Sequence, residues 1–467
     1  MTTMENRSGS TFTWTLGAIF VILSSLATRS SVTGLQGSIR PQHDRAVVCY
    51  VASWATYRRE RAQFGLDDLR PEHCTHLVYA FAGLNASSST IRSLDPYADL
   101  EENYGKGTYK KVTRLRNRYP GLKVTLAIGG WNEGSANYSE LAASAERRRT
   151  FVSDVVDFIR KYDFDGLDLD WEFPAKRGGA PRDKQNFVYL ARDLKDAFRS
   201  KGLLLTAAIG AGIDTIDAAY DIPELSKYLD YIHVMAYDYH GAWDRKVLSN
   251  APLNSAPDQL SVEDSIKYLM KLGAPANKLV LGLPFYGRTF ILNGPLGSPT
   301  ASPIGSNARE IGFPGPFTKQ DGFMGYNEIC RELLNKTNNW RKGWDDASAT
   351  AWAVSEDKVV TYDDPRSIMM KADFANKMKL AGVMIWSIDT DDFRGDCAEV
   401  HDGFLDPLLG IDYPLMRSIN LALSRDPPGN DHGDNRITPA DVPQKSAADF
   451  IVVCVLPIIG TLIFTLF

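Results

Sequence analysis

The sequence predicts an α/β protein, a (β/α)8 TIM barrel with a small α+β insertion between its seventh and eighth strands. Eight short apolar runs, rich in β-branched residues, alternate with amphipathic stretches of helical length such as ERRRTFVSDVVDFIRKY (146–162). The segment 289–379, between the seventh and eighth runs, is too long for an ordinary loop and contains β-like runs such as ATAWAV (349–354). Together these two observations favour a barrel that carries one inserted module.

The apolar runs define the barrel strands in chain order. They are AVVCYVAS (46–53), THLVYAFA (75–82), KVTLAIGG (123–130), FDGLDLDW (164–171), LLLTAAIG (203–210), DYIHVMAYD (230–238), KLVLGLPF (278–285) and AGVMIWSID (381–389). A doubly wound sheet is the alternative, but such a sheet usually carries a glycine-rich phosphate loop after its first strand, and this sequence has none there. We therefore expect the barrel domain at 46–411, with the insertion at 289–379 inside it.

Composition indicates a globular chain without affinity for nucleic acid. Of 467 residues, 44% are hydrophobic and 23% are charged, which supplies ample material for a core. The net charge of -5 gives no electrostatic reason to expect binding to nucleic acid.

Both ends of the chain carry targeting patterns. The apolar run 13–27 ends in small residues and predicts a secretory signal at 1–27, with a signal anchor as the alternative. The polar stretch 424–449 precedes an apolar tail, FIVVCVLPIIGTLIFTLF (450–467), which has no basic residue after it. This pattern predicts a glycosylphosphatidylinositol anchor signal and so membrane attachment at the extracellular face; a transmembrane helix is the alternative.

Cysteine usage agrees with secretion. Once Cys454 of the tail is set aside, four cysteines remain, an even number that suits two disulfides. No pair has CxxC spacing, so we expect no metal site, and three pairings are open. Glycosylation acceptor motifs begin at Asn85, Asn137 and Asn335.

The stretch FDGLDLDWEFP (164–174) places acids at every second position of a hydrophobic run. In a strand, Asp168, Asp170 and Glu172 would share one face, with alternate Cα atoms about 6.6 Å apart. Like charges so close repel, which ordinary packing does not justify. Glu172, the outermost, is expected to be a proton donor with a raised pKa, and Asp168 and Asp170 to titrate as a coupled set. Asp165 is expected to face away from them.

Two other interpretations of these acids remain. A calcium loop would need a glycine and a terminal glutamate that are absent, and a strand is the wrong context for one. A buried polar cluster with a purely structural role is the second alternative. Against it, polar and aromatic residues gather at the carboxyl ends of other strands, where barrel enzymes hold their active sites.

Four motifs together resemble the family 18 glycoside hydrolases, above all arthropod-type chitinases. They are DGLDLDWEFP (165–174), KVTLAIGGWNEG (123–134), VMAYDYHGAWD (234–244) and GLPFYGRTF (282–290). The resemblance implies retaining hydrolysis of β-1,4-linked N-acetylglucosamine, assisted by the substrate's own acetamido group. It implies that Glu172 is the acid, that Asp170 turns between Asp168 and Glu172, and that Tyr237 binds the acetamido oxygen.

The resemblance also implies a substrate groove, two disulfides and a partner. The groove residues are Trp386, Trp131, Asn132, Tyr50, Trp54, Met235, Asp238, Trp243, Tyr286 and Arg288. The implied disulfides are Cys49–Cys74 and Cys330–Cys397. Chitin or N-acetylglucosamine oligomers are the expected partner, with no cofactor, and a monomer is expected.

Three rival functions are consistent with the motifs. Some members of the family bind sugar as lectin-like or growth-factor-like proteins without cleaving it, although they have typically lost the acid. An endo-N-acetylglucosaminidase that acts on the chitobiose core of glycoproteins is a closer rival. A conventional two-carboxylate glycosidase would need a second acid about 5 Å away on another strand.

Overall fold

The structure, a computed structural model, describes residues 43–255, 259–400 and 410–425. Within these ranges, no helix is both long enough and apolar enough to cross a membrane. The expected signal at 1–27, nearly all of the polar stretch 424–449 and the apolar tail at 450–467 lie outside the described residues.

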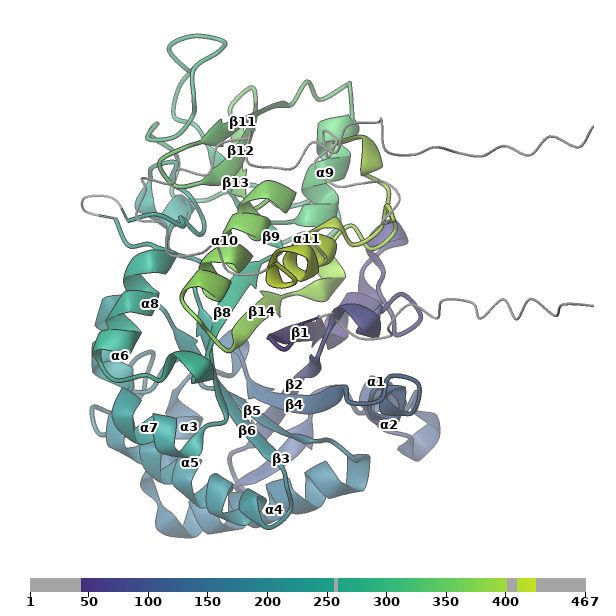
Figure 1. The fold of residues 1–467 in the computed structure, drawn as a ribbon, viewed down its shortest axis with the longest axis vertical. Helices are drawn as coiled ribbons and strands as arrows, with labels where there is room; N and C mark the ends of the chain where they lie inside the picture. The colour runs from purple at the N-terminus through teal and green to yellow at the C-terminus, as the bar shows by residue number, and fades with distance from the viewer. Residues whose placement is uncertain (1–42, 256–258, 401–409, 426–467) are drawn as a thin grey trace, which may run out of the picture.

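Eight parallel strands close into a barrel, as the sequence predicts (Figure 1). The barrel closes because β1 pairs with both β2 and β14. In chain order the strands are β1 (Ala46–Ala52), β2 (His76–Asn85), β4 (Lys123–Gly129), β5 (Gly166–Asp170), β6 (Leu204–Gly210), β7 (Tyr231–Met235), β8 (Leu279–Pro284) and β14 (Gly382–Trp386). A short strand, β3 (Thr90–Ser93), extends β2 as its antiparallel neighbour.

Helices cover the outside of the barrel (Figure 1). They are α1 (Pro96–Asp99), α2 (Thr108–Thr113), α3 (Ala136–Ala143), α4 (Ala145–Tyr162), α5 (Asp183–Arg199), α6 (Ile213–Ala219), α7 (Ile222–Tyr228), α8 (Val262–Lys271), α10 (Pro365–Lys377) and α11 (Pro414–Leu423). In α4, Phe151, Val155 and Ile159 recur at helical spacing and are buried. Ser144 caps the start of α4 by accepting from the Arg147 amide at 3.3 Å.

The alternation of side chains along each strand creates two cores. Outward-facing residues such as Leu167 and Leu169 pack into the main core. Inward-facing residues, among them Val48, Val78 and Met384, fill the barrel interior. The interior is therefore packed, and functional side chains have room only at the ends of the strands.

The insertion is a five-stranded antiparallel sheet with one helix. Its strands are β9 (Tyr286–Ile291), β10 (Phe323–Gly325), β11 (Arg341–Asp345), β12 (Thr350–Ser355) and β13 (Lys358–Tyr362), and its helix is α9 (Tyr326–Leu334). The sheet begins at Tyr286, slightly before the expected boundary at 289. Helix α10 packs against β8, β14 and α11, so it belongs with the barrel helices although the sequence places it in the 289–379 insertion.

Disulfides join Cys49 to Cys74 and Cys330 to Cys397, the pairing that the resemblance implies. The second bond links α9 of the insertion to the segment that follows β14. Each disulfide therefore ties together segments that are distant in sequence.

One fully buried ion pair joins the middle of α10 to the residue before its N-cap. Lys371 bonds to Asp363, and neither side chain has any exposed area. We expect Lys371→Met, which removes the charge and keeps the length, to lower the free energy of unfolding by about 3 to 5 kcal/mol, because a buried carboxylate loses its partner. Chemical denaturation measures this loss.

The controls separate charge from packing. Lys377→Met, at an exposed position of the same helix, should change stability by less than about 0.5 kcal/mol. The double variant Asp363→Leu with Lys371→Met should be more stable than Lys371→Met alone. Wild-type stability in Lys371→Met would contradict the account.

Candidate active site

The acids of β5 lie at the carboxyl end of the barrel interior. Asp168 and Asp170 are buried, and Glu172 follows the strand and is partly buried. Leu169 and Trp171 point the other way into the main core. The alternation along the strand thus places the acids on one face and the apolar side chains that pack into the core on the other.

Asp168 is held by three neighbouring side chains. It accepts hydrogen bonds from the Tyr50 hydroxyl at 2.6 Å and the Thr206 hydroxyl at 2.5 Å, and it lies 3.1 Å from Nδ1 of His233. Burial alone would raise the pKa of Asp168, but His233 and the hydrogen bonds hold it below its usual value. Asp168 is therefore ionised in the middle of the barrel.

The pKa values of Asp170 and Glu172 are raised rather than lowered. Burial, with the charges of Glu172 and Asp168, raises the pKa of Asp170 well above its ordinary value. Oδ1 of Asp170 is buried and has no hydrogen-bond partner in the described part of the chain. Burial raises the pKa of Glu172 to about 7, opposed by Arg177 and assisted by Asp238.

One expectation from the sequence concerns the coupling of these acids. Asp168 and Asp170 were expected to titrate as a coupled set. Their pKa values move in opposite directions, and the charge of Asp168 is one of the causes that raise the pKa of Asp170. Opposite shifts do not contradict the prediction, because ionisation of one of two interacting carboxyls disfavours ionisation of the other. The groups that hold Asp168 ionised come from three other strands and are not visible in the β5 sequence.

Strand β7 contributes the next residues. Met235 ends the strand, and the hydroxyl of Tyr237 lies 3.9 Å from Sδ of Met384. Burial and the charge of Asp170 raise the pKa of Tyr237 well above 10. Tyr237 is therefore protonated and able to donate a hydrogen bond.

The next residue after Tyr237, Asp238, binds a tyrosine and an arginine through its carboxylate. Asp238 accepts from the Tyr286 hydroxyl and from Nε of Arg288, both at 2.7 Å. The Arg288 guanidinium lies 5.2 Å from the ring centre of Trp243, whose side chain is 49% exposed. The structure thus brings together Asp238, Trp243, Tyr286 and Arg288.

Aromatic rings also gather at the ends of the next two strands of the barrel, β14 and β1. The ring centre of Trp386 lies 5.6 Å from that of Tyr50 and 6.1 Å from that of Trp54. Trp54 stacks on Phe81 at 6.0 Å and remains 43% exposed. Planar, partly exposed rings beside acids suit stacking on sugar rings.

Trp131 and Asn132 follow β4, and both are exposed. The Arg177 guanidinium lies 3.5 Å from the ring centre of Trp131. Arg177 also donates to the backbone oxygens of Trp131 and Glu172, each at 2.9 Å. One side chain therefore fixes both an exposed indole and the backbone of Glu172.

Three residues of the site were missed from the sequence: Thr206, His233 and Arg177. His233 alternates with Met235 and Tyr237 in the predicted strand 230–238, which could have placed it on their face. Thr206 is the polar residue in an apolar run. The position of Arg177 follows from a loop fold that no periodicity predicts.

Two further acids support the barrel away from the cluster. Asp165 accepts from the Val124 amide at 2.8 Å and pairs with Arg116 at 2.9 Å, so it faces away from Asp168 as expected. Asp389 binds Arg58 at 2.6 Å and joins the segments that follow β1 and β14. Both acids therefore have structural partners.

The expected glycosylation sites lie at different depths. Asn137 and Asn335 are exposed, and Asn85 is half-buried at the end of β2. Modification at all three remains a prediction.

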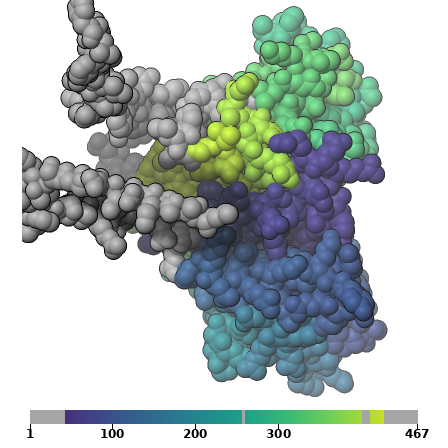
Figure 2. Space-filling view, turned by 90° about the vertical axis from the view of Figure 1, so that its right-hand side faces the viewer, coloured from purple at the N-terminus to yellow at the C-terminus, as the bar shows by residue number. Residues whose placement is uncertain are grey.

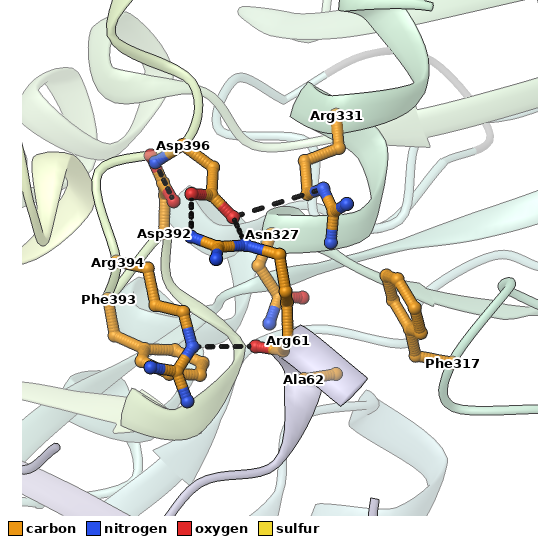
Figure 3. Close-up of a pocket in the computed structure, with 9 residues that line it drawn as sticks. All are labelled: Arg61, Ala62, Phe317, Asn327, Arg331, Asp392, Phe393, Arg394 and Asp396. Atoms are coloured by element: carbon orange, nitrogen blue, oxygen red, sulfur yellow. Dashed lines mark hydrogen bonds and ion pairs between the residues drawn. The ribbon is translucent and has the colours of Figure 1, made fainter. Parts of the chain in front are cut away.

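A small pocket of about 10 Å³ lies at the junction between barrel and insertion rather than at the acids (Figure 3). Arg61 and Arg331 both contact Asp396 there, and Arg394 donates to the Arg61 carbonyl at 3.0 Å. The volume suits about one water molecule. In the described part of the chain, Cys330, Cys397 and Asp392 form the one group with metal-ligand atoms close together, and the two thiols are joined in a disulfide.

Comparison with known proteins identifies the family. The chain matches the Glycosyl hydrolases family 18 over residues 46–391. It belongs to this family. It is 48% identical over 456 residues to Probable chitinase 2 of Drosophila melanogaster, with 92% of each chain covered.

Solved structures of family 18 proteins have the same fold. The Group IV chitinase of Ostrinia furnacalis, in complex with allosamidin, gives a TM-score of 0.75 at 40% identity, with 82% of this chain and 99% of that chain covered. Human YKL-39, described as a pseudo-chitinase with retained chitooligosaccharide binding properties, gives a TM-score of 0.71 at 29% identity, with 82% of this chain and 100% of that chain covered. A chitinase and a pseudo-chitinase therefore share this fold, so the fold alone does not reveal whether a protein cleaves sugar. That question must be answered from the site residues.

The contact between Arg177 and Glu172 predicts a pH effect. Arg177 lowers the pKa of Glu172, so Arg177→Ala should raise that pKa above about 7. More Glu172 would then stay protonated at alkaline pH, and the alkaline limb of the kcat profile for glycoside hydrolysis should move to higher pH. Measurement of kcat across pH tests this.

Arg177→Lys is the matched control, because it keeps the positive charge and loses the planar stacking on Trp131. Its alkaline limb should stay close to that of the wild type. An unchanged or lower limb in Arg177→Ala would contradict the electrostatic role of Arg177.

Proposed function

We propose that this family 18 enzyme is a chitinase, which hydrolyses β-1,4-linked N-acetylglucosamine polymers with retention of configuration by substrate assistance. The observation that carries the proposal is the pKa of Glu172, raised to about 7 by burial. A carboxyl with that pKa can protonate a leaving oxygen and then, once ionised, activate water at neutral pH. The names of the similar proteins support chitin as the substrate.

The state of Asp170 supports the acetamido group as nucleophile. A two-carboxylate retaining mechanism needs an ionised carboxylate to attack the sugar. Asp170 has a raised pKa, and Asp168 is enclosed by Tyr50, Thr206 and His233. Neither carboxyl is suited to attack, so the substrate's own oxygen is the better nucleophile.

In the first step, the acetamido oxygen bonds to the anomeric carbon while the bond to the glycosidic oxygen breaks. Glu172 transfers its proton to that leaving oxygen. Asp170 binds the acetamido N–H, and Tyr237 donates to the acetamido oxygen. Both contacts orient the nucleophile, and Asp170, which accepts from the N–H, also stabilises the positive charge that develops on the cyclic oxazolinium intermediate.

In the second step, ionised Glu172 takes a proton from water, and the water oxygen bonds to the anomeric carbon. The bond from that carbon to the acetamido oxygen breaks at the same time, which opens the oxazolinium ring. Two successive displacements leave the configuration unchanged. Trp386 supports the reacting sugar, while Trp131, Trp54 and Trp243 offer further exposed faces.

The binding-only alternative is disfavoured by the same residues. A lectin of this fold would not need an acid with a pKa near neutrality beside a tyrosine donor. This chain has Glu172, Asp170 and Tyr237 at one end of the barrel. Catalysis is therefore the better proposal.

We also propose that the enzyme is secreted and held by a lipid anchor at the extracellular face of the membrane, where it turns over chitin of cuticle or a related matrix. The apolar segments 13–27 and 450–467 support this location. The two disulfides suit an oxidising compartment.

The test is hydrolysis of a fluorogenic N-acetylchitotrioside by wild type and Glu172→Gln. We expect the variant to lose about a thousandfold in kcat, because the amide can neither donate nor accept the transferred proton. Glu140→Gln, at an exposed glutamate of α3, is the matched control and should keep full activity.

A second substrate separates the mechanisms. The deacetylated trisaccharide should not be hydrolysed by wild type, since it lacks the acetamido nucleophile. Equal rates on both substrates would contradict substrate assistance. Binding of the acetylated substrate by wild type without turnover would contradict the chitinase proposal.

A further inference from the structure

The short 3-10 helix η1 (Ser53–Tyr57) follows β1 and is bound at both ends by one buried side chain, that of Asp389. The amide of Ala52, just before η1, donates to Oδ1 of Asp389 at 3.1 Å. Nη1 of Arg58, just after η1, donates to Oδ2 of Asp389 at 2.6 Å. The Asp389 side chain has no exposed area and that of Arg58 is 10% exposed, so water screens this charged bond little.

Asp389 thereby links two aromatic rings of the active site. Trp386 ends β14, three residues before Asp389 in the chain, and Trp54 lies in η1. The centres of the two rings are 6.1 Å apart. Asp389 follows the first ring closely in sequence and holds both ends of the helix that carries the second. The position of Trp54 relative to Trp386 therefore depends on this carboxylate.

Packing alone does not hold η1 in place. Figure 2 shows the segment after β1 (purple) at the surface, between the insertion (green) and the blue segments. Of the five residues of η1, Ala55 is the one that is buried. Trp54 stacks on Phe81 and still remains 43% exposed. A helix this short is not stable by itself, so it keeps its position through the contacts at its ends.

We propose that Asp389 is a positioning residue for substrate binding, which holds Trp54 beside Trp386 so that one N-acetylglucosamine oligomer contacts both rings. An indole that is held in place before binding loses less conformational freedom when a sugar stacks on it, which raises the affinity. In the described part of the chain, Asp389 and Arg58 make no hydrogen bond or ion pair with Glu172. Loss of their bond should therefore weaken binding without changing proton transfer. This inference rests on the proposed function and names a residue that holds its groove in place.

The experiment breaks one of the two ties, with Arg58→Met in the full-length protein. Met keeps a long side chain and loses the bond to Asp389. We measure kcat and KM on the fluorogenic N-acetylchitotrioside, and the Kd of the unlabelled trisaccharide in the Glu172→Gln background. We expect KM and Kd to rise at least about fivefold, a loss in the range of one aromatic contact, and kcat to stay unchanged. Arg58→Lys should restore most of the affinity, because Nη1 alone of the Arg58 nitrogens bonds to Asp389.

Two comparisons separate positioning from stability. Arg148→Met is the matched control, because the Arg148 side chain is 8% exposed and bonds to Asp193 at 2.8 Å, in helix α4 outside the barrel. This control should lower the thermal midpoint and leave KM unchanged. In the Trp54→Ala background, Arg58→Met should raise KM little further, because its effect acts through a ring that is already removed. A purely structural role would give losses that add.

Wild-type KM and Kd in Arg58→Met would overturn the positioning role and leave the chitinase proposal intact, and so would a full further rise of KM in the Trp54→Ala background. Absence of turnover in wild type would instead overturn the proposed function, while the Kd in the Glu172→Gln background would still decide the positioning role. If Arg58→Met does not fold, Asp389→Asn takes its place in the same comparisons with the same expected rise. Asparagine keeps a side-chain oxygen for the Ala52 amide and loses the charge that binds Arg58.

Discussion

The neighbours of the Asp168 carboxylate keep it ionised inside the barrel, and its charge helps to keep Asp170 protonated. Tyr50 from β1 and Thr206 from β6 donate to it, and His233 from β7 lies beside it, so Asp168 stays ionised although it is buried. Its fixed negative charge then disfavours a second charge on Asp170. Glu172, which lies just after the strand, also has a raised pKa, so the acid nearest the base of the site ionises first. A change at any of these three residues would therefore alter the chemistry without touching the substrate.

The barrel makes this arrangement possible because it closes. Strands β5, β6 and β7 are neighbours, while β1 lies across the interior, and only closure brings Tyr50 to Asp168. At the end of β4, Gly129 has a φ of +115°, and a Cβ there would meet the Asp170 carbonyl at 2.1 Å. Glycine is required at this position so that β4 can pair beside the acids. The loops above the barrel then carry the aromatic residues toward the same end.

The sequence predicted the strands well because their pattern is local. Each barrel strand begins and ends within about three residues of its apolar run, since alternation along a strand depends only on which face is buried. The position of Glu172 followed from the same alternation. The insertion was predicted from segment length, but α10 was assigned to it because an amphipathic helix does not reveal which sheet it covers. The donors to Asp168 could not be predicted, since they come from strands far apart in the chain. Arg177 was missed because its position depends on the fold of a loop.

The measurement that tests the order of ionisation most directly is a pH titration of the side-chain carboxyl carbons by NMR, with 13C-labelled aspartate. Spectra of Asp168→Asn and Asp170→Asn would assign the two signals. The account predicts that Asp168 titrates below the ordinary aspartate range and Asp170 above it. Titration of both residues together near the ordinary value would contradict the account, because the barrel would then not separate the roles of its acids.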